Sequence, residues 1–410
     1  MRRVLMIAYH FPPFAGSSGV QRTLRFVQQL PAHGWQPVVL TVRPQAFEQT
    51  SEDLMASVPA EVPVYRAFAL DAQRHLSFRG RYPGALARPD RWVSWAFGAI
   101  PQILTILRKE RPAVVWSTYP IATAHIVGSM AHRWSRLPWV ADFRDPMAQD
   151  DYPTDPATWR SFARIEAHAV KRAAVSVFTT RSAAQTYRTR YPAAADRIVT
   201  IENGYDEESF AGIAPGVDQV RGGRITLLHS GVVYPVERDP SVFFSVLAHL
   251  KRSGVVSKGS FCVRFRASGN DALLRRLASE HGIEDLIELA PSIPYRAALA
   301  EMSEVDGLLV LQASNCNEQI PAKAYEYLRT YRPLVGLADP AGDTGDLLRR
   351  SGVPYIAALH DAAGIEQALR RYLIDAAAGS AAVPSRESVE LHSRAARTKQ
   401  LAEIFNRLAR

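Results

Sequence analysis

The sequence contains few cysteines and no apolar run of the kind that crosses a membrane. Cys262 and Cys316 are its only cysteines, and neither has the close second cysteine of a zinc motif. Two cysteines cannot form a disulfide framework in a chain of 410 residues, so we expect reduced, buried thiols and a cytoplasmic protein. Segment 92–107 is apolar but only 16 residues long, whereas a membrane-spanning helix needs about 20. The sequence therefore predicts neither a disulfide-stabilised fold nor a transmembrane helix.

The composition also excludes fibrous and disordered classes of protein. Hydrophobic residues make up 47% of the chain and charged residues 22%, which is typical of globular proteins. The net charge is +9 at pH 7, so we expect an anionic partner: a nucleic acid, a phosphorylated small molecule or an anionic membrane surface. The basic residues are spread along the chain, without a helix-turn-helix, RNP or zinc pattern, and this argues against nucleic acid.

Short β-branched runs alternate with helical segments in both halves of the chain. The strand candidates are 4–9, 37–42, 62–68, 113–118, 138–143, 175–180 and 198–203, followed by 225–231, 261–268, 287–291, 307–312, 333–338 and 354–359. Several of these runs are continuously apolar, as in parallel sheets that are covered on both faces. The pattern predicts an α/β protein with two doubly wound, Rossmann-like domains.

A segment rich in Gly, Asp and Glu separates the two series of strands. We therefore predict an N-terminal domain over 1–205, a linker over 206–223 and a C-terminal domain over 224–384. Residues 385–410 are expected to form a C-terminal helix, because apolar residues recur on one face of that segment.

Polar residues that follow the strands of the first half are candidates for a site, since ligands of open α/β sheets bind at the carboxyl ends of the strands. Gly16 and Gly19 lie where a helix begins, and they suit a phosphate or sugar hydroxyl or simply a tight turn. Asp142 and Arg144 follow a strand and either bind substrate or brace a loop through an ion pair. His125, near a helix start, contacts a polar substrate or packs in the core. The loop that contains Gly16 and Gly19 matches neither the GxGxxG motif nor a Walker motif.

The second half contains the more specific pattern. Gly231 follows the first strand of this half and lets a ligand approach the backbone, while Arg238 either grips a diphosphate or faces solvent. Glu318 and Glu326 are separated by seven residues, and Lys323 lies between them where a helix begins. A helix N-terminus with a lysine suits a pyrophosphate, and carboxylates suit sugar or ribose hydroxyls.

At these residues the sequence resembles the family 4 glycosyltransferases of the GT-B fold. The matching segments are the FPPxxG opening, DFRDP, NGYDEESF, GVVYPVERDP and the Glu-x7-Glu element that includes PAKAYEYL. The resemblance implies two Rossmann-like domains that face each other across a cleft, with the C-terminal helix packing back toward the N-terminal domain. It also implies a retaining hexosyltransferase that uses a nucleotide diphosphate sugar and needs neither a metal nor another cofactor.

The resemblance assigns roles to individual residues of the donor site. Glu318 would hold hydroxyls of the donor sugar and Glu326 would hold the ribose. Gly16 would lie beneath the junction of diphosphate and sugar. The loop around Ile293 and Pro294 would hold the base through backbone contacts and packing.

Neutralisation of the diphosphate is the point at which the sequence departs from the family pattern. Arg238 would take the position of the family's basic residue, but Val232 stands where many members have an arginine. Charge neutralisation would then depend on Arg238, Lys323 and helix dipoles, together with Arg144. The implied mechanism is front-face attack, in which the protein positions the substrates and stabilises the departing diphosphate.

The acceptor is not identified by the sequence. It is a glycan, a lipid-linked glycan or another glycoconjugate, and cell-surface polysaccharide synthesis is the expected context. Segment 71–111 combines arginines with tryptophans, which suits either peripheral contact with an anionic membrane at its inner face or a solvated basic loop. A GT-B sugar-nucleotide epimerase and a non-catalytic homologue that binds nucleotide sugar or a partner are the alternative functions.

Overall fold

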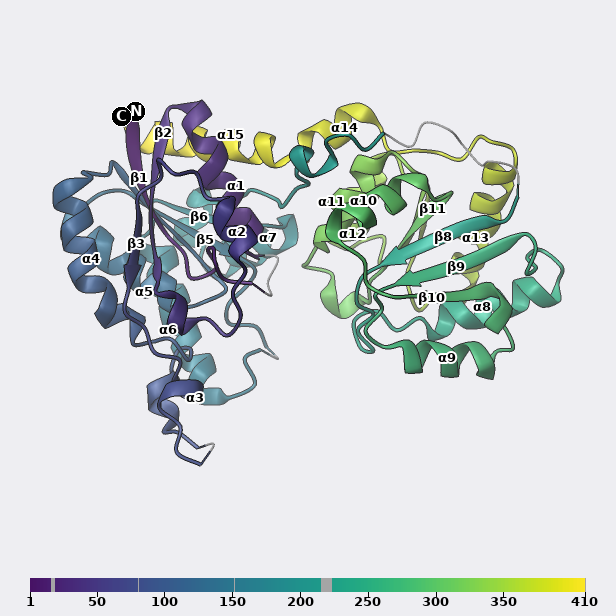
Figure 1. Cartoon of the computed structure of the whole chain (residues 1–410), viewed down its shortest axis with the longest axis horizontal. Coiled ribbons are helices and arrows are strands. Elements are labelled where there is room, and N and C mark those ends of the chain that lie inside the picture. The colour runs from purple at the N-terminus through teal and green to yellow at the C-terminus, as the bar shows by residue number, and fades with distance from the viewer. Residues whose placement is uncertain (16–18, 80, 151, 215–222, 410) are drawn as a thin grey trace. The chain divides into compact units, whose positions relative to one another are not determined.

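The computed structural model divides into two compact units, each of which is described by itself (Figure 1). The N-terminal unit comprises Met1–Asn203 and Arg394–Arg410, and the C-terminal unit comprises Gly204–Ser393. The structure describes residues 1–15, 19–79, 81–150, 152–214 and 223–409.

The N-terminal unit is built on a parallel sheet of seven strands in the order β3-β2-β1-β4-β5-β6-β7. The strands are β1 Arg2–Ile7, β2 Trp35–Val42, β3 Val64–Ala67, β4 Val114–Thr118, β5 Trp139–Arg144, β6 Val175–Phe178 and β7 Ile198–Thr200. The helices are α1 Gly19–Gln29, α2 Glu52–Ala56, α3 Ala72–His75, α4 Trp95–Lys109, α5 Thr123–Ser135, α6 Pro156–Arg172, α7 Arg181–Arg190 and α15 Arg394–Leu408. Each strand predicted in this half is confirmed.

The continuously apolar strands of this sheet are buried on both faces. Leu5 and Ile7 of β1 point into one hydrophobic cluster, which includes residues of α4 and α5. Val4 and Met6 point into a second cluster, which includes residues of α1 and α15. Successive side chains of a strand alternate between faces, so a run without polar residues needs helices on both sides of the sheet.

The C-terminal unit repeats this architecture with a parallel sheet of six strands in the order β10-β9-β8-β11-β12-β13. The strands are β8 Ile225–Ser230, β9 Phe261–Arg266, β10 Ile287–Ala290, β11 Gly307–Leu311, β12 Leu334–Leu337 and β13 Tyr355–Ala357. The helices are α8 Ser241–Arg252, α9 Asp271–Glu280, α10 Tyr295–Glu304, α11 Ala322–Thr330, α12 Asp343–Arg350, α13 Ala362–Ala377 and α14 Arg386–Leu391. The predicted α/β class with two Rossmann-like domains is confirmed.

The boundaries between the units differ from those predicted. A short 3-10 helix, Glu207–Phe210, lies within the predicted linker. Tyr205 and Phe210 are buried in the hydrophobic core of the C-terminal unit, so this unit begins earlier than expected. The rest of the predicted linker includes 215–222, which lies outside the described residues.

The predicted helix over 385–410 is divided into α14 and α15. The chain leaves the helical path because the carbonyl of His392 accepts a hydrogen bond from the amide of Tyr205, and Ser393 forms a bridge with the same residue. Helix α15 then packs on the N-terminal unit, as predicted, where Phe405 meets the Trp35 ring at a centroid distance of 5.3 Å.

The apolar segment near residue 100 forms a core helix. Helix α4 places Ala99, Ile103 and Ile106 in the cluster beneath the sheet. Within the ranges that the structure describes, every helix is too short or too polar to cross a membrane.

Candidate functional site

The predicted residues of the second half gather at one edge of the C-terminal sheet. Strands β8, β9 and β10 succeed one another in one direction, and β11, β12 and β13 succeed one another in the other. The loops after the adjacent strands β8 and β11 therefore diverge, which is where doubly wound folds bind ligands. Gly231 follows β8, and Glu318 lies between β11 and α11.

Lys323 lies directly beside Gly231. Gly231 has φ +108°, and a Cβ at that position would be only 3.1 Å from Lys323 Nζ. Lys323 belongs to the first turn of α11, so the ammonium group, the free amides of the helix and the open backbone at Gly231 occupy neighbouring positions. This combination suits an anionic ligand.

His229 is within hydrogen-bond distance of the Lys323 amino group. Nζ of Lys323 lies 3.1 Å from Nε2 of His229, and Nδ1 of His229 lies 2.9 Å from the carbonyl oxygen of Leu309 on β11. The sequence analysis did not select His229. The available signal was an ionisable residue inside the apolar strand ITLLHS.

Burial decides the charge of this pair. Burial lowers the pKa of His229 well below its ordinary value, and the nearby Lys323 lowers it further, so the ring is neutral. Burial also lowers the pKa of Lys323 to about 7, with Arg238 acting in the same direction and Glu326 opposing both. The lysine is therefore poised to gain a proton when an anion arrives.

Arg238 lies in the loop after β8. Its Nη1 donates to the carbonyl of Val232 at 2.5 Å, and its guanidinium lies 5.0 Å from the centre of the Tyr234 ring. The side chain is half-buried. The loop thus holds this guanidinium on the same side of the sheet edge as Lys323, whose pKa it lowers.

Glu326 is linked to the loop that was predicted to hold a base. The Tyr295 hydroxyl donates to Oε1 of Glu326 at 2.7 Å. Tyr295 is the first residue of α10, directly after Ile293 and Pro294. The structure therefore brings the predicted base loop and the predicted ribose carboxylate together.

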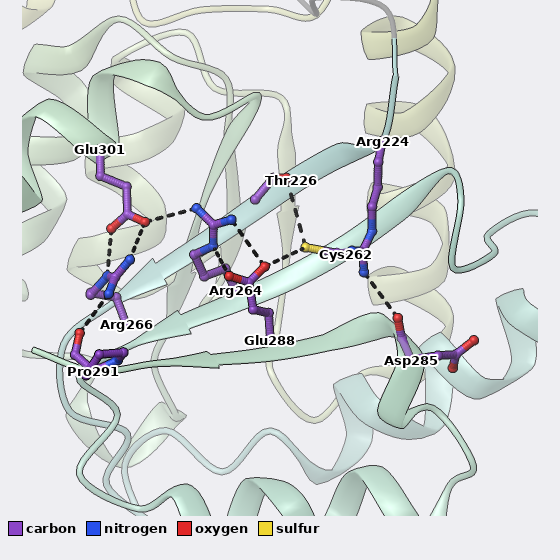
Figure 2. Close-up of polar contacts among 9 residues, drawn as sticks. All are labelled: Arg224, Thr226, Cys262, Arg264, Arg266, Asp285, Glu288, Pro291 and Glu301. Carbon is purple, nitrogen blue, oxygen red and sulfur yellow. Dashed lines mark hydrogen bonds and ion pairs between the residues drawn. The ribbon is translucent and has the colours of Figure 1, made fainter.

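A charged network holds α10 in place (Figure 2). Arg266, at the end of β9, donates from Nε to Oε2 of Glu301 on α10 at 2.8 Å and from Nη1 to the carbonyl of Pro291 at 2.8 Å. Arg264 of β9 joins Glu301 to Glu288 of β10. Although burial raises the pKa of Glu301, the hydrogen bonds and charges of the two arginines lower it overall.

Glu318 lies in a turn that Gln312 organises. Nε2 of Gln312 donates to the carbonyls of Cys316 and Gln319, and Thr344 donates to the Gln319 carbonyl at 3.1 Å. Gln312 is only 4% exposed. Sequence reasoning did not find Gln312, because a glutamine after a strand has no distinctive pattern.

Three candidates of the N-terminal unit, Gly19, Asp142 and Arg144, lie where α1 begins and β5 ends. Gly16 lies outside the described residues, and Gly19 begins α1. Asp142 is fully buried and accepts from Arg22 of α1, with Nε and Oδ2 2.9 Å apart. Arg22 also donates to the carbonyl of Ile201. This ion pair corresponds to the second interpretation of Asp142, in which the residue braces a loop.

Arg144 lies at a bulge of β5 with a left-handed backbone, φ 64°. Its Nε is buried and has no hydrogen-bond partner among the residues that the structure covers. Burial lowers the pKa of Arg144. Burial, followed by the charge of Arg144, lowers the pKa of His10 to about 3.

His125 lies in the core of the N-terminal unit. It is 1% exposed, its Nδ1 is 2.8 Å from Oγ of Ser117, and its ring packs against Phe143. Oγ of Ser117 also accepts a hydrogen bond from Nε1 of Trp139 at 2.8 Å. Burial lowers the pKa of His125 to about 3. Of the two predictions for His125, this position corresponds to packing in the core.

Comparison with known families identifies the N-terminal unit. Residues 18–204 match the family model described as "Glycosyl transferase 4-like domain". The match covers less than half of the chain and lies in the unit built on β1 to β7. The predicted resemblance to the family 4 glycosyltransferases is thereby confirmed. The sequence has no significant match among curated proteins.

Solved structures share the fold of this chain over its whole length. Sucrose-phosphate synthase from Thermosynechococcus elongatus is 14% identical with a TM-score of 0.64, over 100% of this chain and 99% of the other. Anabaena HepE in complex with UDP is 14% identical with a TM-score of 0.63, over 99% and 100%. The lipopolysaccharide outer core galactosyltransferase WaaB is 11% identical with a TM-score of 0.64, over 99% of both chains. At such identities the likeness shows the GT-B fold.

Potential metal ligands lie apart from one another in the described part of the chain. Across those residues, no three His, Cys, Asp or Glu side chains gather as a metal site. Asp142 and Asp145, which follow the DxxD spacing, point to different partners: Arg22 holds the first, and Thr179 donates to the second.

Proposed function

We propose that this protein is a retaining, metal-independent hexosyltransferase. It would transfer a sugar from a nucleotide diphosphate sugar to a glycan, lipid-linked or other glycoconjugate acceptor. The observation that carries this proposal is the sheet edge of the C-terminal unit, where Lys323, Gly231 and the N-terminus of α11 adjoin one another. A diphosphate matches that edge in charge and in its need for backbone amides.

Each remaining residue of that edge has a part of the donor to bind. Glu326, held by Tyr295, accepts hydrogen bonds from the ribose. The loop at Ile293 and Pro294 holds the base, and Glu318 holds hydroxyls of the sugar. Arg238 shares the diphosphate charge with Lys323.

The candidates of the N-terminal unit are assigned to substrate binding as well. Arg144 and Gly19, together with Gly16 as the family resemblance implies, would contact phosphate or sugar oxygens. Asp142 and His125 support these loops from the core, since both are buried.

The reaction proceeds by front-face attack. The acceptor oxygen bonds to the anomeric carbon on the side from which the diphosphate leaves, and the bond between that carbon and the phosphate oxygen breaks. The acceptor proton passes to a phosphate oxygen of the leaving group. Lys323 and Arg238 stabilise the negative charge that develops there.

Uridine nucleotides are the first donors to test. Anabaena HepE, which shares the fold, forms complexes with UDP and with UDP-glucose. A thermal-shift comparison of UDP, GDP, dTDP, ADP and CMP with their sugar conjugates identifies the base. We expect stabilisation by one diphosphate that Glu326→Ala removes and that Glu304→Ala, an exposed control on α10, retains.

Transfer itself is tested at Glu318. With the identified donor and an acceptor extract, Glu318→Ala is expected to abolish sugar transfer while leaving the unfolding temperature unchanged. Near-normal turnover by this variant contradicts the proposal.

A sugar-nucleotide epimerase is the second candidate. The fold is shared with a Listeria monocytogenes protein described as a putative UDP-N-acetylglucosamine 2-epimerase. The TM-score is 0.55 and the identity is 10%. An epimerase would change the donor sugar without any acceptor, whereas the proposed transferase releases nucleotide in step with acceptor. Nuclear magnetic resonance of the donor alone with enzyme separates the two.

The expected setting is cell-surface polysaccharide synthesis at the inner face of the membrane. Phe78, in the basic segment 71–111 of the N-terminal unit, is 77% exposed, and the Arg79 guanidinium lies 5.5 Å from the centre of its ring. Such a pairing suits an anionic surface. We expect salt-sensitive flotation with phosphatidylglycerol vesicles that Phe78→Ser weakens. Flotation equal to that with neutral vesicles contradicts membrane contact.

A further inference from the structure

Lys323 and His229 form a part-buried polar contact at the sheet edge of the C-terminal unit to which the donor is proposed to bind, here called the donor edge. His229 is 0% exposed, and its two ring nitrogens face different groups. One faces the carbonyl of Leu309 at 2.9 Å and the other faces Lys323 Nζ at 3.1 Å. The contact thus connects the middle of β11 to the first turn of α11 through a single imidazole.

The tautomer of His229 follows from its partners. A backbone carbonyl only accepts hydrogen bonds, so Nδ1 of His229 carries the proton. The Nε2 atom then has a lone pair that accepts from the Lys323 ammonium. A doubly protonated ring would place an N–H against that ammonium, and burial excludes this form as well.

The remaining protons of Lys323 are available to a ligand. His229 is the one hydrogen-bond partner of Nζ among the residues in the described ranges. The ammonium lies where a side chain at Gly231 would otherwise be. A flexible four-carbon lysine would not hold this place without a partner, because its side chain loses rotamer entropy on ordering.

We propose that His229 is a positioning residue of the donor site: its neutral Nε2 holds the Lys323 ammonium beside Gly231, where the ammonium binds the diphosphate of the nucleotide sugar. This inference rests on the proposed function and adds a residue to it. The charged groups that face the pair are Arg238 from the loop after β8 and Glu326 from α11.

The first test needs no ligand. In protein labelled with ¹⁵N-histidine, His229 is expected to show a protonated Nδ1 and an unprotonated Nε2 from pH 8 to pH 5, and Lys323→Met is expected to shift the Nε2 resonance. A proton on Nε2, or a resonance that Lys323→Met does not move, overturns the inference. This result stands even if the protein binds no nucleotide, an outcome that would contradict the proposed function instead.

The second test measures binding of UDP, or of whichever nucleoside diphosphate stabilises the wild type, by calorimetry. Loss of a hydrogen bond to a charged group corresponds to roughly a 10-fold change or more, so His229→Phe should weaken binding by about that factor. His229→Gln, whose amide oxygen can accept from Lys323, should restore part of the affinity. His249→Phe, on the exposed face of α8, is the matched control.

A double-mutant cycle separates positioning from a general effect on packing. In a Lys323→Met background, His229→Phe is expected to have no further effect on affinity, because the residue acts through the lysine. Equal losses in both backgrounds, or the absence of any loss, overturn the inference. If His229→Phe fails to fold, His229→Gln completes the same cycle.

Discussion

At the scale of single residues, Lys323 lies at the donor edge in surroundings that disfavour its positive charge. Burial and Arg238 lower the pKa of Lys323 to about 7, and Glu326 offsets only part of this effect. The unliganded protein therefore loses stability at this position. Such a cost is common at binding sites, where a ligand later supplies the missing interaction.

Replacing Lys323 is expected to stabilise the unliganded protein. In the unfolded chain a lysine has a pKa of about 10.4, so the unfolded state binds more protons between pH 7 and 10 and wild-type stability rises over that range. Below pH 7 both states are protonated and the cost is largest. Lys323→Met should raise the free energy of unfolding at pH 6 on the order of 2 kcal/mol, allowing for partial exposure, and by less at pH 9.5.

Urea denaturation at both pH values measures this difference, with Lys399→Met as an exposed control on α15. The same Lys323 variant should bind nucleotide more weakly than the wild type. A destabilised variant at pH 6, or one with the same advantage at both pH values, would show that the ammonium has another partner in solution.

At the scale of elements, the position of α10 governs the base and ribose region. The helix starts at Tyr295, which touches Glu326, and its far side is held by Arg266 through Glu301. Arg266 also contacts the Pro291 carbonyl, at the start of the base loop (Figure 2). One arginine on β9 therefore supports both the loop and the helix that follows it.

Removing this support should weaken nucleotide binding without removing any group that touches the nucleotide. Arg266→Met is expected to lower the affinity for the stabilising nucleoside diphosphate by about 10-fold, because Glu301 and the Pro291 carbonyl each lose a charge-assisted hydrogen bond. Calorimetry measures the change. Arg276→Met, which breaks an exposed pair on α9, should have no effect, and unchanged affinity in Arg266→Met would argue against the support.

The elements themselves were largely predictable, and the site only partly so. Buried parallel strands appear as short apolar runs bounded by polar turns, which is why each predicted strand has a counterpart in the structure. Glu318, Lys323 and Glu326 were found because they follow a recognisable spacing around one helix start. His229 and Gln312 were missed because their importance depends on a neighbouring strand and loop that are far away in sequence.

At the scale of the whole molecule, the last helix of the chain, α15, packs into the hydrophobic core of the N-terminal unit. Helix α15 adds Leu401, Ile404 and Phe405 to the hydrophobic cluster that contains Val4 and Met6 of β1. A buried ion pair between Arg397 and Glu202, 2.7 Å long, joins the same helix to the segment after β7. The unit therefore consists of two stretches of chain, separated by the C-terminal unit.

Truncating the side chain of Phe405, on α15, should destabilise the N-terminal unit. Phe405 is fully buried, and Phe405→Ala removes its contact with Trp35, so we expect a loss of ~3–5 kcal/mol in the N-terminal unit. Tryptophan fluorescence during urea unfolding reports this loss, because all seven tryptophans lie in the N-terminal unit. Nucleotide binding by the C-terminal unit should persist. Glu403→Ala, exposed on the same helix, is the control; equal stability of both variants would contradict the role of this contact.

The order of strands, the two-domain organisation and the family resemblance can be deduced from the sequence, because apolar runs, turns and motif spacings are local properties. The pairing of side chains across the fold is not local. Asp142 meets Arg22, and His229 meets Lys323, because parallel sheets bring the ends of distant strands and the starts of distant helices to one edge. Burial at that edge then sets the charge of each group, and burial is a property of the folded chain alone.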